Sequence, residues 1–184
     1  MKKTVLTFGV ISGAMLSIMM LLTVPFADRI GFDKSVVIGY TTMVLAFLMV
    51  FFGIRSYRDN VSGGFISFGR AFTVGGLIML IGCAFYVITW EIIYFNLMPD
   101  FADKYAAYLV DKAKAAGKSE ADIEALRQQV MTYKPMLDNP LINAAITLIE
   151  PLPVGLLITL ISSAILRKKR TDESAEVGNQ MART

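Results

Sequence analysis

Two glutamates are the residues of this sequence with the clearest capacity for chemistry. Glu91 directly follows a run of 20 residues that contains no aspartate, glutamate, lysine or arginine, and Glu150 is the single charge in residues 141–166. A carboxylate in apolar surroundings is expected to face protein or water, to bind a cation, or to stay protonated. Pro151 and Pro153 follow Glu150 and predict a kink or break in a helix there, because proline lacks the backbone donor. Glu91, Glu150, Pro151 and Pro153 therefore form one candidate polar site.

The rest of the composition argues against an enzyme. The chain has no histidine and one cysteine, Cys83, which removes His-based acid–base catalysis, most zinc and haem sites and an intrachain disulfide. The two glutamates could act as acid and base, but no nucleophile or metal-ligand set accompanies them. We therefore expect a non-enzymatic protein with no catalytic residue, no cofactor and no metal site.

Four long stretches almost free of charge must position these glutamates. About 20 apolar residues in a helix, each rising about 1.5 Å, cross the ~30 Å hydrocarbon core of a bilayer. The stretches predict membrane spans at about 4–27, 35–54, 71–95 and 141–166. The sequence thus predicts an all-α membrane protein, with a four-span membrane domain over 1–168 and a disordered polar tail over 169–184.

The two glutamates are predicted to lie at similar depth. Counted from Ala71, Glu91 lies ~30 Å from the inner boundary, and counted from Leu166, Glu150 lies ~24 Å from it. One interpretation is a site that handles protons or cations, or a polar pocket that the proline break opens and the two glutamates share. In the other, Glu91 reaches the outer surface, and Glu150 caps the break or contacts a loop base such as Arg127.

The distribution of charge predicts the orientation. Residues 1–3, 55–70 and 167–184 contain ten basic and four acidic residues, whereas 28–34 and 99–140 contain eight basic and nine acidic residues. Basic residues gather on the cytoplasmic side, so both termini are expected in the cytoplasm, with the opposite orientation as the alternative. The basic cluster 167–170 is interpreted as an anchor that can also contact anionic lipid, and too few bases accompany it for a nucleic-acid surface.

Residues 99–140 are predicted to form two amphipathic helices outside the membrane. Pro99 suits a first helical turn, Gly117 suits a helix end and Ser119 resembles a capping residue. Pro135 is expected to close the second helix. Each helix has one apolar face, so the simplest arrangement is a small cap over the outer ends of the spans.

Small side chains and aromatic rings are grouped within the spans. The first and fourth spans carry small-residue stripes that let helices approach closely, within the chain or between two copies. These candidate packing residues are Gly9, Gly13, Ser17, Gly155, Thr159 and Ser163. Aromatic residues crowd the outer half of the third span and predict an interfacial belt. They are Phe85, Tyr86, Trp90, Tyr94 and Phe95.

Several segments make the chain resemble a known family. They are residues 39–47, 52–59, 67–72, 90–96 and 150–155. With them the chain resembles the bacterial membrane family called domain of unknown function 4199 over most of 1–168. The resemblance implies a bacterial cytoplasmic-membrane protein with about four spans, and it implies no activity and no functional residues.

Two functions remain as expectations. The first is a non-enzymatic accessory or scaffold protein of the bacterial cell envelope, whose partners are membrane lipids and another membrane protein or a second copy. The alternative is a small proton- or cation-coupled transporter, or a transport-complex subunit, that uses Glu91 and Glu150. Four spans are few for a transporter acting alone, so that alternative predicts an oligomer.

Overall fold

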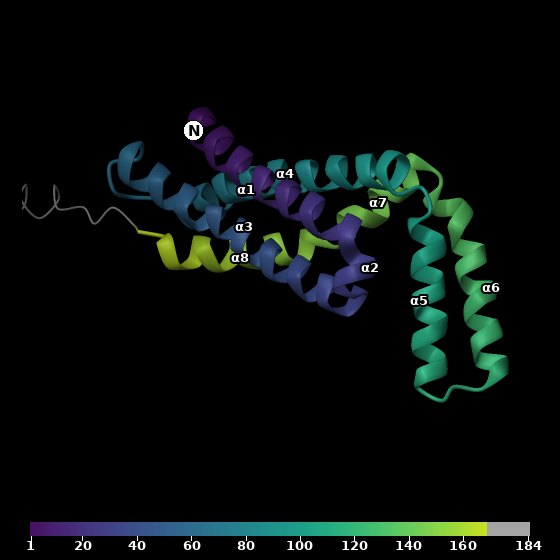
Figure 1. The fold of residues 1–184 in the computed structure, drawn as a ribbon. Coiled ribbons are helices and arrows are strands. Elements are labelled where there is room, and N and C mark those ends of the chain that lie inside the picture. The colour runs from purple at the N-terminus through teal and green to yellow at the C-terminus, as the bar shows by residue number, and fades with distance from the viewer. Residues whose placement is uncertain (169–184) are drawn as a thin grey trace, which may run out of the picture.

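A computed structural model describes residues 1–168 and shows a helical bundle with a projecting helical hairpin (Figure 1). Its long helices are α1 (Lys2–Thr23), α3 (Phe32–Asn60), α4 (Phe68–Ile92) and the consecutive pair α7 (Pro140–Ile149) and α8 (Pro151–Leu166). They confirm the prediction of four helical stretches long and apolar enough to cross a membrane. The predicted disordered tail, 169–184, lies outside the described residues.

Helices α3 and α4 form the central pair of the bundle. Helix α1 packs against both of them, and α8 packs against the same two helices, while α7 packs chiefly on α4. A short 3-10 turn (Val24–Phe26) and helix α2 (Ala27–Ile30) connect α1 to α3. We call the end with α2 the hairpin end and the end with Arg167 the basic end.

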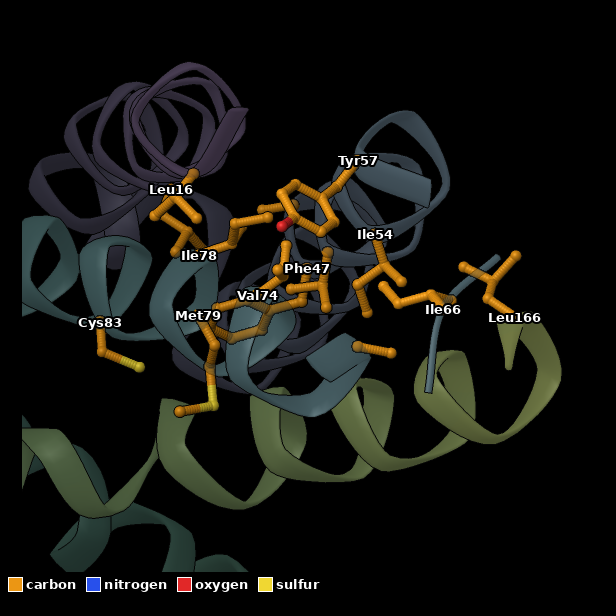
Figure 2. Close-up of a cluster of buried hydrophobic side chains, with 14 of the residues drawn as sticks. Leu16, Phe47, Ile54, Tyr57, Ile66, Val74, Ile78, Met79, Cys83 and Leu166 are labelled. Atoms are coloured by element: carbon orange, nitrogen blue, oxygen red, sulfur yellow. The ribbon is translucent and has the colours of Figure 1, made fainter. Parts of the chain in front are cut away.

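The main hydrophobic core fills the middle and the basic end of the bundle. Figure 2 shows side chains from α1, α3, α4 and α8 meeting there, with Phe47 and Val74 between the helices. Phe47, Val50, Ile54, Val74 and Ile78 are fully buried. A smaller cluster of Met20, Ile93 and Met98 occupies the hairpin end. The bundle is therefore closely packed through one half, and its larger open spaces lie in the other.

Small residues let the helices approach one another. A Cβ added at Gly13 would overlap the ring of Phe85 on α4, and one added at Gly155 would lie 3.0 Å from the sulfur of Met79. Ser17 exchanges a 2.7 Å hydrogen bond with Thr89. The predicted packing residues Gly9, Gly13, Ser17, Gly155, Thr159 and Ser163 all face contacts within the chain or are buried in it.

Polar contacts fix the basic end. Arg70 donates hydrogen bonds of 3.1 and 3.3 Å to the hydroxyl of Tyr57. Ile66 and Lys168 exchange two backbone hydrogen bonds, of 2.9 and 3.0 Å. The loop between α3 and α4 is thus tied to the end of α8, which holds the basic residues at one level of the bundle.

The segment that follows α4 is a two-helix hairpin. The last turn of α4 widens into a π-helical turn (Ile93–Leu97), after which α5 (Phe101–Ala115) and α6 (Glu120–Leu137) run antiparallel. Gly117 joins them with φ +70°, a conformation that favours glycine. The Ser119 side chain accepts a 3.2 Å hydrogen bond from the backbone of Asp122 and so caps α6. Both predicted amphipathic helices are therefore present.

Two predicted helix boundaries were wrong. Pro99 precedes the first helix, which begins at Phe101 after the N-cap Asp100. Pro135 does not close the second helix, because α6 continues through it to Leu137. A proline this close to the end of a helix removes one hydrogen bond but leaves only a short run of residues to accommodate it.

The hairpin crosses the end of the bundle at a steep angle (Figure 1). Phe32 at the start of α3 packs against the rings of Phe101, Tyr105 and Tyr108 on α5, at centroid distances of 6.2, 5.7 and 4.8 Å. Asp33 pairs with Lys112 at 2.6 Å, and this hydrogen bond raises the pKa of the Lys112 ammonium. Aromatic packing and an exposed ion pair therefore join α5 to the bundle.

Candidate functional site at the break between α7 and α8

The fourth apolar stretch is broken at Glu150, as the two prolines predicted. Helix α7 ends at Ile149, Glu150 caps both helices, and Pro151 is the first residue of α8. Proline at position 153 cannot donate to the carbonyl of Ile149, so the backbone ladder does not continue across the junction. The break places the Glu150 side chain at a fixed point between two helices instead of along a continuous helical face.

The carboxylate of Glu150 is held by a tyrosine of the central helix. The hydroxyl of Tyr86 donates a 2.7 Å hydrogen bond to Oε2 of Glu150. No other hydrogen bond or ion pair to the Glu150 side chain is found within residues 1–168. Arg127, the suggested basic partner, lines a separate pocket between α5 and α6. Glu150 therefore has a neutral donor on one oxygen and no countercharge in the described chain.

A second polar network lies beside this pair, on the side of the hairpin. The indole Nε1 of Trp90 donates a 2.8 Å hydrogen bond to Oδ1 of Asn143, a side chain only 1% exposed. Thr147 donates to the same oxygen at 3.1 Å, and the Asn143 amide donates to the carbonyl of Leu137 at 2.8 Å. Every polar atom of the Asn143 side chain is thus engaged, which locks α7 against α4.

Tyr86, Trp90 and Glu150 separate two pockets and line both of them. The first pocket has a volume of about 290 Å³ and lies between α1, α3, α4 and α5. The second has a volume of about 540 Å³ and lies between α3, α4, α7 and α8. Pro153 lines the second pocket as well. A carboxylate, a phenol and an indole therefore stand together where the bundle is least filled.

Glu91 lies apart from this arrangement. It follows Tyr86 by five residues, which places it about 140° further around α4. It lines neither of the two pockets, and its Oε1 is a buried atom without a hydrogen-bond partner among the described residues. The structure therefore groups Glu150 with Pro151, Pro153 and the aromatic residues of α4, and it places Glu91 on a different side of that helix.

Sequence reasoning missed three residues of the site. The sequence predicts an interfacial belt for Tyr86 and Trp90 and does not indicate that both donate hydrogen bonds to the fourth apolar stretch. Asn143 lies in the apolar stretch 141–166, where its polar side chain alone gives no separate signal. The available signals were the four-residue spacing of Tyr86 and Trp90, which puts both on one helical face, and the same spacing of Asn143 and Thr147.

The site offers hydrogen bonding and charge, with little capacity for a metal ion. Within residues 1–168, no three histidine, cysteine, aspartate or glutamate side chains lie close enough together to hold a metal ion. The arrangement is suited to binding a small molecule. One carboxylate presents negative charge, and the aromatic side chains present apolar surface and ring faces.

The sequence of the chain matches the model of one protein family. A family model described as "Protein of unknown function (DUF4199)" matches residues 7–168. The chain belongs to this family. The match covers the bundle except for the first turn of α1, together with the hairpin, and it includes Tyr86, Trp90 and Glu150. No curated protein and no solved structure is significantly similar to the chain.

Proposed function

We propose that this DUF4199 protein is an integral protein of the bacterial cytoplasmic membrane, with four spans, cytoplasmic termini and an external α5–α6 hairpin. The observation that supports it best is apolar surface on every long helix. Ile149 is 68% exposed, Val37 66% and Ile165 65%. Residues of this kind facing outward from α1, α3, α4 and α8 suit contact with lipid, because a soluble monomer rarely exposes so large an apolar area.

The proposed role is that of a non-enzymatic accessory or scaffold protein of the cell envelope, acting through lipid and protein contacts. Its support is the character of the site, where the groups that meet are a carboxylate, a phenol, an indole and an amide. The small-residue stripes already pack within the chain, so a partner would bind elsewhere. The hairpin projects beyond the bundle, and none of the residues of α6 is buried, so it offers free surface to a partner.

Membrane extraction tests the proposal. Membranes of the producing bacterium would be washed with alkaline carbonate, which releases peripheral proteins, and then treated with detergent. The protein should stay in the membrane through the first step and dissolve only in the second. Release by carbonate would contradict a four-span protein.

A second candidate, a transport function, is favoured by the break at Glu150. Broken helices at membrane depth let transporters expose polar groups to substrate. The test compares Glu150→Gln with Glu91→Gln for proton or cation flux in proteoliposomes and for thermal stability in detergent. Flux lost at unchanged stability would support transport, whereas equal flux from vesicles with and without the protein would remove it.

A further inference from the structure

The pocket between α1, α3, α4 and α5 combines a single negative charge with aromatic walls. Its aromatic side chains come from α3, α4 and α5, and they are Phe32, Tyr86, Trp90, Phe101 and Tyr105. Among residues 1–168, Glu150 is the only charged residue that lines it, and no lysine or arginine contributes to the lining. A pocket of this composition attracts positive charge, both through the carboxylate and through the negative faces of the rings.

The rings support one another as a rigid wall. Trp90 and Phe101 meet edge to face at 5.0 Å, and Phe101 stacks on Tyr105 at 6.1 Å. Phe32 closes the arrangement, with its ring 5.7 Å from that of Tyr105. Because Phe101 and Tyr105 belong to α5, the hairpin forms part of the pocket wall and separates it from the space beyond the end of the bundle.

The chemistry of the lining decides which cation fits. A metal ion requires several oxygen ligands to replace its water, and one carboxylate beside apolar rings does not supply them. An alkylated ammonium ion holds its water weakly and is the cation that aromatic cages recognise. The volume of about 290 Å³ is at the lower end for ligand pockets and is too small for a two-chain lipid.

We propose that this pocket binds a small organic ammonium ion with an apolar substituent, its charge held between Glu150 and the aromatic side chains that line the pocket. Tyr86 positions the Glu150 carboxylate by its hydrogen bond, which leaves the second oxygen free for the ligand. This ligand class goes beyond the accessory role proposed above and requires only that the protein is inserted in a membrane. The carbonate wash tests insertion separately, so failure of one proposal is distinguishable from failure of the other.

Trp90 provides the readout, because it is the only tryptophan of the chain and lines the pocket. The full protein would be placed in phosphatidylglycerol nanodiscs and titrated with benzyltrimethylammonium while Trp90 fluorescence is followed. Its neutral isostere, neopentylbenzene, would be titrated in parallel. We expect a saturable change with the ammonium and at least about tenfold weaker binding of the isostere. Equal affinity for the two, or no saturable change, would overturn the proposal.

Variants and lipid composition complete the test. Glu150→Gln, which retains an acceptor for Tyr86, should weaken ammonium binding at least about tenfold, and Phe101→Leu by several-fold. Glu91→Gln is the matched control and should bind as the wild type does. An unchanged affinity in Glu150→Gln would contradict the assignment. Adding phosphatidylethanolamine to the nanodiscs should leave the affinity unchanged, whereas strong competition would identify a lipid headgroup as the occupant and overturn a free ammonium ligand.

Discussion

The Tyr86 hydroxyl on α4 donates a 2.7 Å hydrogen bond to the Glu150 carboxylate, across 64 positions of sequence. This contact joins the central helix of the bundle to the break between α7 and α8. It gives a charged residue within an apolar stretch a defined position, and it orients the carboxylate toward the two pockets that meet there. The same hydrogen bond therefore holds the junction between α7 and α8 against α4 and positions the carboxylate that is proposed to bind the ammonium ion.

Removing that hydrogen bond should destabilise the protein modestly. We expect Tyr86→Phe to lower the free energy of unfolding by about 1 kcal/mol, since hydrogen bonds between membrane helices contribute on this order. Thermal unfolding in detergent, followed by Trp90 fluorescence, measures the effect. Tyr40→Phe is the control, because Tyr40 lines the second pocket and makes no side-chain hydrogen bond in the described chain. Equal effects of the two variants would show that the contact does not hold the break.

Asn143 should matter more than Tyr86. Its side chain is buried and serves three hydrogen bonds, so Asn143→Ala leaves Trp90, Thr147 and the carbonyl of Leu137 without their partner. We expect a loss of about 2 kcal/mol in the same unfolding assay. Trp90 emission should also shift to shorter wavelength, because the indole no longer donates. Asn96→Ala, at an exposed position, should change neither quantity, and unaltered emission from Asn143→Ala would contradict the network.

The helices and the break could be predicted from the sequence, because their causes are local. A charge-free run of about 20 residues has few alternatives to a long helix, and Pro151 and Pro153 each remove a backbone donor from the middle of that run. The partners of Glu150 could not be predicted, because the rotation of α4 decides whether Tyr86 points into the bundle or to its surface. The rotation of α4 about its axis depends on how several helices pack together, so the spacing of residues along α4 alone does not predict it.

Close packing of α1 on α4 gives a prediction with a matched control. Gly13→Ala should destabilise the protein by about 1–3 kcal/mol, because its added Cβ would overlap the ring of Phe85. Gly76→Ala, also within a long helix, meets nothing within 4 Å and should be neutral or stabilising by up to about 1 kcal/mol. Thermal unfolding in detergent compares the two. A Gly13→Ala variant as stable as Gly76→Ala would contradict the close approach of the helices.

The hairpin should depend on aromatic packing more than on its ion pairs. Phe32→Ala removes the ring that contacts Phe101, Tyr105 and Tyr108, so α5 should detach more readily and limited proteolysis near Gly117 should accelerate several-fold. Lys112→Ala removes an exposed ion pair with Asp33 and exposed contacts with Tyr108 on the same helix, and it should change the cleavage rate little. A larger effect from Lys112→Ala would reverse this ranking.

The contact that positions the hairpin on the bundle could not be predicted from the sequence either. The amphipathic patterns predicted two helices over 99–140 but could not show that α5 uses Phe32 as its contact, because Phe32 lies in a short turn that the sequence assigned to no span. Its role follows from the start of α3 at Phe32, earlier than the predicted beginning of the second span at residue 35.

Labelling of single cysteines tests the proposed membrane topology most directly. In a Cys83→Ala background, Lys114→Cys places a thiol near the tip of the hairpin, and Ser62→Cys places one in the loop at the basic end. A membrane-impermeant maleimide should label the cysteine at position 114 in intact spheroplasts and the cysteine at position 62 only after permeabilisation. Labelling at position 62 in intact spheroplasts, with position 114 protected, would contradict the orientation, and labelling of both in intact spheroplasts would contradict the four-span arrangement.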